Sequence, residues 1–275
     1  DMGPKASVRI QFEHMGDELC YGTLLSKEKS TGPASAWDGR MESAPKEYMD
    51  PGIWEIFVNY KDPDGYYFLQ RSWKVSESKE LAWTYYPPGD FKILLYYPET
   101  ETFVSSGIYA RYAFDTYYTV DMDGVDIGSV EYNDDLSTNE RIEAYRSYNY
   151  RQEMLALGAR IVLTILIEML VALLFGFRQK KQLLILAVVN IITQIILNVL
   201  LNVINYNSGP LAFTFFYVLF ELIVFALEAV LYCTILKRLS EKKKEDAYYI
   251  LYSFVANLIS FGAGLFLAAK LPGMF

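Results

Sequence analysis

Three carboxylates interrupt the long apolar stretches in the second half of the chain, at Glu168, Glu221 and Glu228. Side-chain amides accompany them in the neighbouring stretches, at Asn190, Gln194, Asn198 and Asn257. An ionisable group inside a membrane span is costly, so each carboxylate needs a partner or a function. Carboxylates supply charge and amide carbonyls complete an oxygen shell, which is the chemistry of a buried cation or proton site.

Helical spacing groups these residues into layers. Glu221 and Glu228 are seven residues apart and therefore share a helix face, two turns from each other. Counting from the ends of the expected spans places one layer at Glu168, Asn190, Glu228 and Asn257. A second layer, nearer the middle of the membrane, would contain Thr164, Gln194 or Asn198, and Glu221.

Arg160 is the candidate charge partner for these carboxylates. It lies four residues before Thr164, on the same side of the first apolar stretch and near its outer end. Its long side chain can pair with a carboxylate or extend outward to the membrane surface.

Three interpretations of the polar residues stay open. They can form an ion, proton or ligand site, they can bond across spans to fix the packing, or they can face a protein partner. A bound ion or a file of water between Glu168, Asn190, Glu228 and Asn257 would indicate the first interpretation. Direct contacts with no enclosed space would indicate packing.

The composition predicts which domains contain these residues. Residues 1–153 carry 27 acidic and 15 basic residues, whereas the remainder carries 6 and 10. All four Trp and 17 of the 23 Tyr lie in the first half. The sequence therefore predicts two domains: an extracellular domain at 1–133, joined by a helical or loose connector at 134–154 to a membrane domain at 155–270.

Four apolar segments are long enough to span about 30 Å of hydrocarbon, at 155–177, 182–205, 210–236 and 248–270. Basic residues concentrate in the loops 178–181 and 237–247, so the positive-inside rule places both loops in the cytoplasm. The N-terminal domain and the C-terminus then lie outside. We expect a multi-pass protein of the bacterial plasma membrane, embedded in the lipid bilayer, whose signal peptide has been removed.

The first half predicts an all-β antiparallel sandwich of the immunoglobulin-like type. Short runs rich in Val, Ile, Tyr and Phe alternate with turn signals. The turn at 62–65 should join strands at 54–60 and 66–75, and a further strand should cover 91–97.

Consecutive tyrosines in a strand point to opposite faces, so each pair should leave one ring outside. The candidate exposed rings are Tyr67, Tyr86, Tyr97 and Tyr118. Such rings can bind a sugar or peptide, for example a cell-wall ligand, or the lipid interface. The alternative is that they fill the core or simply suit a strand.

Composition excludes several classes of function. The acidic first half offers no basic face for a nucleic acid. The single His14 and the two cysteines, Cys20 and Cys233, leave no material for a zinc site, a Ser/His pair or a disulfide framework. We expect no cofactor and no metal, and an intramembrane enzyme is the least favoured class. The acidic stretch at 121–131 fails the EF-hand spacing and is typical of a turn.

Five segments resemble uncharacterised bacterial envelope proteins in which an exported domain precedes four spans. They are Gly16–Leu25, Ser35–Gly39, Phe175–Arg178, Asn190–Gln194 and Glu221–Tyr232. The resemblance covers the whole chain. It implies a bacterial, exported protein and carries no activity with it.

Three functions are compatible with these observations. The first is an extracellular ligand- or partner-binding β domain with a buried polar site, acting in binding or transport within a larger assembly. Such an assembly needs a protein partner or a homo-oligomer. The second is a self-contained ion- or proton-coupled transporter or channel, and the third is a structural or scaffold subunit whose polar residues only pack.

Overall fold

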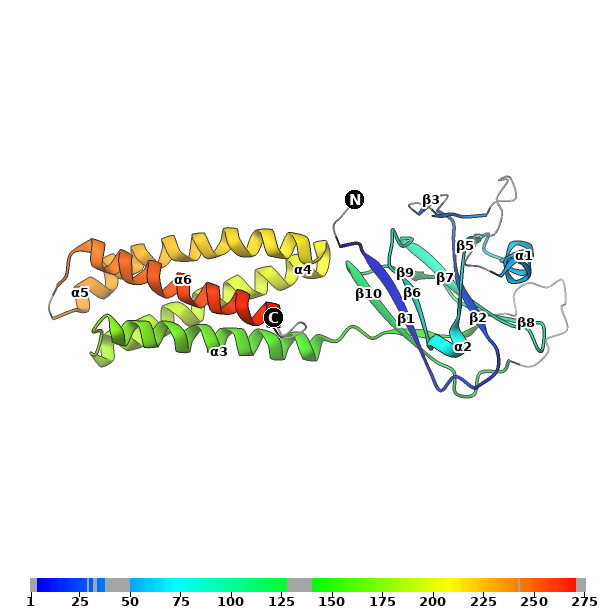
Figure 1. Ribbon diagram of the computed structural model, residues 1–275, viewed down its shortest axis with the longest axis horizontal. Coiled ribbons are helices and arrows are strands. Elements are labelled where there is room, and N and C mark those ends of the chain that lie inside the picture. Colours follow the sequence, from blue (N-terminus) through cyan, green and yellow to red (C-terminus); the bar gives the residue numbers. More distant parts are fainter. Residues whose placement is uncertain are drawn as a thin grey trace. The chain divides into compact units, whose positions relative to one another are not determined.

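The computed structural model describes residues 4–28, 30–31, 34–37, 50–127, 140–241 and 243–270. The chain forms two compact units that divide between Tyr148 and Asn149. The first unit contains β-sheets and the second contains long apolar helices, as the contrast in composition predicts. The ribbon diagram shows the strands of the first unit and the helices of the second (Figure 1).

The first sheet of the β domain has the strand order β12-β10-β1-β6. Its strands are β1 (Ser7–Glu13), β6 (Glu80–Trp83), β10 (Asp115–Asp121) and β12 (Ala144–Arg146). β1 and β10 pair in parallel, with Val8 opposite Thr116. The prediction of a purely antiparallel sandwich is therefore wrong. About 100 residues separate these two strands, and a connection of that length can return the chain in the same direction.

The second sheet has the order β11-β8-β7-β2-β5, with β9 also paired to β7. Its strands are β2 (Tyr21–Ser26), β5 (Tyr67–Lys74), β7 (Asp90–Tyr97), β8 (Thr102–Ser106), β9 (Tyr109–Ala110) and β11 (Glu140–Ile142). β5 and β7 confirm the strands predicted at 66–75 and 91–97. β3 (Ser30–Thr31) and β4 (Ala34–Ser35) form a separate small hairpin.

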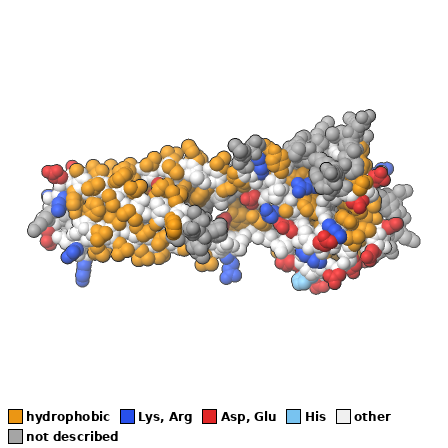
Figure 2. Space-filling view, in the orientation of Figure 1, with side chains coloured by type: hydrophobic (Ala, Val, Ile, Leu, Met, Phe, Trp, Pro, Cys, Tyr) orange, Lys and Arg blue, Asp and Glu red, His pale blue; other side chains and the backbone are white. Residues whose placement is uncertain are grey.

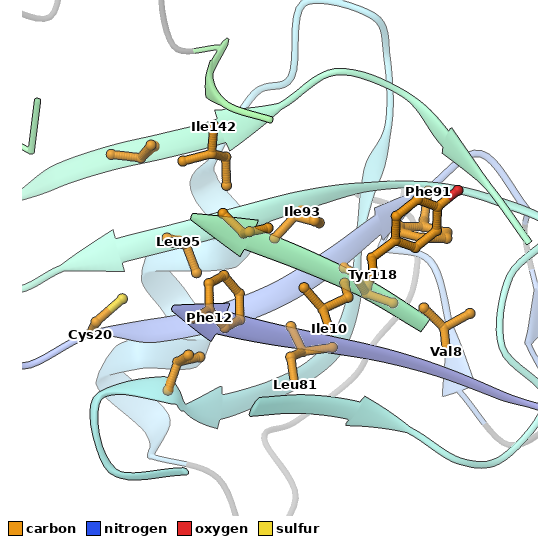
Figure 3. Packing of buried hydrophobic residues seen from close by; sticks show 14 of the residues in the cluster. Val8, Ile10, Phe12, Cys20, Leu81, Phe91, Ile93, Leu95, Tyr118 and Ile142 are labelled. Atoms are coloured by element: carbon orange, nitrogen blue, oxygen red, sulfur yellow. The ribbon is translucent and has the colours of Figure 1, made fainter. Parts of the chain in front are cut away.

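The two sheets enclose one hydrophobic core. Val8, Ile10 and Phe12 of β1 meet Ile93 and Leu95 of β7 in this core (Figure 3). Alternate residues of β7 point to its other face, where Leu94 and Tyr96 join a second apolar cluster. β7 is therefore covered on both sides, which explains its continuous apolar sequence.

A helix, α1 (Pro51–Asn59), stands where a strand was predicted at 54–60. Asp50 caps it by accepting hydrogen bonds from the backbone N–H groups of Gly52 and Ile53. Its apolar residues follow helical rather than alternating spacing, so Ile53, Trp54 and Phe57 reach the second cluster together. A short helix, α2 (Val75–Ser78), follows β5. The β domain is thus not all-β.

Residues 140–146, expected to be helical or loose, form strands instead. β11 pairs in parallel with β8, and β12 pairs antiparallel with β10. This stretch therefore belongs to both sheets of the first unit. Residues 128–139 lie outside the described part of the chain.

The second unit is a bundle of helices: α3 (Tyr150–Leu174), α4 (Lys180–Leu231), α5 (Lys237–Leu239) and α6 (Asp246–Lys270), with a π-helical turn at Tyr232–Leu236. Gly209 interrupts α4 with a φ of 81° and a ψ of −178°, and Pro210 follows it. The two arms of α4, 180–208 and 210–231, fold back on each other (Figure 1). Thr193 and Glu228, 35 residues apart, are hydrogen-bonded across the arms.

Within the part of the chain that the structure describes, three helices are long and apolar enough to cross a membrane: Tyr150–Leu174, Lys180–Leu239 and Asp246–Phe266. Apolar side chains cover the face of the bundle seen in Figure 2. Leu155 and Leu174 are among the most exposed. The two loops with basic residues lie at the same end of the bundle, because Gln182 bonds to Ser240 and the Tyr248 hydroxyl donates to the Phe175 carbonyl.

Candidate functional site

The structure brings the predicted polar residues together inside the helical unit. Glu168, Asn190 and Glu228 have no exposed surface. Gln194, Asn198 and Asn257 are also buried. Glu221 is half-buried. α3, both arms of α4, and α6 each contribute at least one of these side chains.

We call Glu168, Asn190, Glu228 and Asn257 the carboxylate layer. Each oxygen of Glu228 accepts a hydrogen bond within it: Asn257 Nδ2 donates to Oε2 at 2.7 Å and Thr193 Oγ1 donates to Oε1 at 2.9 Å. Both contacts join different helical segments. They are the direct contacts that the packing interpretation predicts.

Only one of the two carboxylate oxygens of Glu168 accepts a hydrogen bond of normal geometry. Ser260 Oγ donates to its Oε1 at 3.3 Å, while its Oε2 has no hydrogen-bond partner of normal geometry. Asn190 lies beside it and accepts a hydrogen bond from the Tyr232 hydroxyl at 3.2 Å. Among the described residues, no Lys or Arg lies within ion-pair distance of Glu168 or Glu228.

Tyr252 is a residue of this layer that our sequence analysis did not single out. Its hydroxyl donates to the Glu168 backbone carbonyl at 3.3 Å, and its side chain is fully buried. A sequence signal existed, because Tyr252, Ala256, Ser260 and Gly264 follow one another at steps of four along α6.

The second predicted layer surrounds a cavity of about 40 Å³, which we call the Glu221 cavity. All four helical segments line it. The polar or small lining residues are Arg160, Thr164, Gln194, Asn198, Tyr217, Glu221 and Gly264. Gly264 makes room for the Tyr217 hydroxyl, because a Cβ atom at this position would lie 2.8 Å from that oxygen.

Two polar atoms at the Glu221 cavity lack hydrogen-bond partners: Gln194 Nε2, a donor, and Glu221 Oε2, an acceptor. A water molecule needs roughly 10–15 Å³ and two or more polar partners, so the cavity satisfies both requirements. Water there can accept from Gln194 and donate to Glu221. The arrangement therefore suits a hydrated, exchangeable carboxyl group.

Arg160 makes no ion pair with a carboxylate among the described residues. Its Nε donates to the Ala156 carbonyl of its own helix at 3.4 Å, and its guanidinium lies 5.9 Å from the centre of the Phe213 ring. Arg160 therefore lines the Glu221 cavity without forming an ion pair with Glu221.

The four candidate tyrosines of the β domain have different surroundings. Tyr67 and Tyr86 are 44% and 47% exposed, whereas Tyr97 and Tyr118 are each 4% exposed. The prediction that Tyr97 and Tyr118 present outer rings is wrong. Tyr97 belongs to β7, which is covered on both faces, and the Tyr118 hydroxyl reaches inward to the Ala110 carbonyl.

The acidic stretch after β10 forms a turn in its described part. Asp121 accepts from the Asp123 backbone N–H at 3.0 Å and contacts His14 Nδ1 at 2.8 Å. The described residues contain no group of three or more His, Cys, Asp or Glu side chains placed to hold a metal ion. Glu131 lies outside the described residues.

Comparison of the chain with models of protein families, with curated proteins and with solved structures finds no match. Function must therefore be inferred from the residues themselves.

Proposed function

We propose that this is a multi-pass membrane protein of the bacterial envelope that exchanges a proton or small cation at Glu221, as the membrane part of a binding or transport assembly. The observation that carries the proposal is the Glu221 cavity, because two of its lining residues, Glu221 and Gln194, each have a buried polar atom without a hydrogen-bond partner. A buried polar atom left unpaired in a membrane is costly, so a bound species is expected to complete these bonds.

The carboxylate layer has a different role in this proposal. Glu228 already receives two hydrogen bonds across the helical segments, so its contacts favour packing. The layer fixes the arms of α4 against α6. The Glu221 cavity is the place where a species can enter and leave.

The proposed topology has four crossings. A straight helix of 52 residues would be about 78 Å long, far more than about 30 Å of hydrocarbon. The break at Gly209 divides α4 into two arms, each long enough to cross once. With both basic loops in the cytoplasm, the β domain and the C-terminus lie outside.

The experiment is infrared difference spectroscopy of the protein in lipid vesicles, between about pH 5 and about pH 8. We expect a protonated-carboxyl band that changes with pH in the wild type and is lost in Glu221→Gln. Cation exchange is tested at constant pH, by replacing a large organic cation in the buffer with sodium and recording whether the same carboxyl band changes.

Glu228→Gln is the matched control, because it removes a carboxyl seven residues away on the same helix face. It should leave the Glu221 band in place. A Glu221→Gln spectrum that equals the wild-type spectrum would overturn the proposal, and so would loss of the band in Glu228→Gln alone.

A further inference from the structure

A lysine lies in the interior of the β domain. Lys92 on β7 has no exposed surface. It shares its face of the strand with Leu94 and Tyr96, which belong to the apolar cluster against α1. An amine in such surroundings is costly as an isolated ammonium and therefore needs close partners.

The turn after α1 supplies two carboxylates to this lysine. Lys92 Nζ lies 2.8 Å from Asp62 Oδ1 and 2.9 Å from Asp64 Oδ2. The side chains of Lys92 and Asp62 are both fully buried, whereas the Asp64 side chain is 44% exposed. One carboxyl is thus enclosed with the amine and the other has access to water.

The two oxygens of Asp62 have different environments. Oδ2 accepts hydrogen bonds from the backbone N–H groups of Asp64 at 3.0 Å and Tyr66 at 3.2 Å. Oδ1 touches Lys92 Nζ but makes no hydrogen bond of normal geometry. Two fixed backbone donors on one oxygen stabilise the negative charge that develops when a nucleophile adds to the carboxyl carbon.

We propose that Lys92 and Asp62 condense to form an intramolecular isopeptide bond. The neutral Lys92 amine adds to Asp62 Cγ, and the negative charge develops on Oδ2 under the two backbone N–H groups. The N–C bond forms, the Cγ–Oδ1 bond breaks, and Oδ1 leaves as water. Ammonium and carboxylate thus become an amide and one water molecule, with no oxidant or co-reactant.

Asp64 is placed to move the protons of this reaction. The hydrogen bond and charge of Lys92 lower the pKa of Asp64, so Asp64 is a carboxylate near neutral pH. It can carry two protons in turn from Nζ to Oδ1: the first gives a neutral amine beside a protonated Asp62 carboxyl before the addition, and the second lets Oδ1 leave as water afterwards. Its exposure gives the released water a route to solvent.

The bond would tie the turn after α1 to the centre of the second sheet. It would close a loop between residues 62 and 92 that contains β5, α2 and β6. A covalent tie of this kind restricts the unfolded chain and should make the domain more resistant to heat and proteases.

The test is the intact mass of the purified full-length chain under denaturing conditions. We expect a mass lower by one water than the sequence requires. After digestion, the segments that contain residues 62 and 92 should appear as one branched peptide. A full sequence mass, with the two segments recovered as separate peptides, would overturn the proposal.

The peptide map is needed because Asp64-Gly65 can also lose water by closing a succinimide on its own backbone. A water loss confined to a single unbranched peptide at residues 64–65 would therefore count against the isopeptide bond. The exposed Lys74–Glu77 pair, at 2.5 Å, is the matched internal control and should remain unlinked.

Two variants test the chemistry without removing the lysine. Asp64→Asn should fold and keep the full sequence mass, because it cannot accept a proton. Asp62→Asn should cross-link with loss of ammonia in place of water, because the amide nitrogen then leaves Cγ. An Asp64→Asn chain that is fully cross-linked would overturn the role assigned to Asp64.

Discussion

Glu221 and Glu228 share one face of α4 but meet different partners. The Glu228 carboxylate accepts one hydrogen bond on each oxygen, from a hydroxyl and from an amide. Glu221, two turns away, borders a cavity with one oxygen unpaired. The same residue type therefore serves packing at one position and, in our proposal, exchange at the other.

Removing the Glu228 carboxyl should destabilise the bundle. Glu228→Ala leaves Asn257 Nδ2 and Thr193 Oγ1 without this acceptor, and hydrogen bonds between membrane helices contribute about 0.6 kcal/mol each on average. We expect a loss of about 1–2 kcal/mol, measured by unfolding in detergent. Glu241→Ala, at an exposed position, is the control and should change little. Equal stability of Glu228→Ala and wild type would contradict the packing role.

His14 should respond to pH through its contact with Asp121. The hydrogen bond and charge of Asp121 raise the pKa of His14 above its ordinary value of about 6.5. The contact therefore stabilises the fold below that value and loses its effect as pH rises through the raised pKa. NMR titration should give a midpoint above about 6.5, and Asp121→Asn should return it toward the ordinary value. An unchanged midpoint in Asp121→Asn would refute this.

At the scale of elements, the break at Gly209 decides the shape of α4. Its φ of 81° with a ψ of −178° is a conformation that essentially only glycine adopts. Gly209→Ala should cost about 1–3 kcal/mol in unfolding measurements and weaken the contact between Thr193 and Glu228.

Gly262→Ala is the matched control for Gly209. Gly262 lies in α6, where an added Cβ would meet no atom within 4 Å. Because alanine favours a helix over glycine, this variant should be neutral or slightly stabilising. Similar destabilisation by both substitutions would mean that the break has no special role.

The helices were predictable from sequence, whereas parts of the β domain were not. Long apolar runs fix helix positions to within a few residues, and steps of four place Asn190 and Gln194 on one inner face. α1 was missed because its nine residues are as short and apolar as a strand, and only the Asp50 cap marks a helix. The parallel pairing of β1 with β10 depends on contacts between distant segments, which local patterns do not record.

The residues of the candidate site could be predicted from the sequence. Which carboxylate packs against neighbouring helices and which borders a cavity could not. Helical counting placed Glu168 and Glu228 in one layer and Glu221 in another, as the structure has them. Whether space remains between side chains depends on the packing of neighbours, such as Tyr217 against Gly264. The spacing of residues along one sequence does not show how closely side chains from different helices pack.

At the scale of the whole molecule, the proposed topology predicts which loops face outward. On a Cys233→Ser background, a thiol placed by Ser208→Cys should react with a membrane-impermeant maleimide from outside. A thiol placed by Arg178→Cys should react only after the membrane is opened. Cys20 should stay silent, because burial raises the pKa of its thiol to about 12. Outside labelling of Arg178→Cys in sealed cells would contradict the topology.

The role of Glu221 can be tested by an experimental structure in a lipid bilayer, at a resolution that shows bound water. We predict density for a water between Gln194 Nε2 and Glu221 Oε2, or for a cation in contact with Glu221 Oε2. We also predict direct contacts, with no bound species, between Glu228 and Asn257. An empty Glu221 cavity, together with an ion or water file at the carboxylate layer, would contradict these predictions.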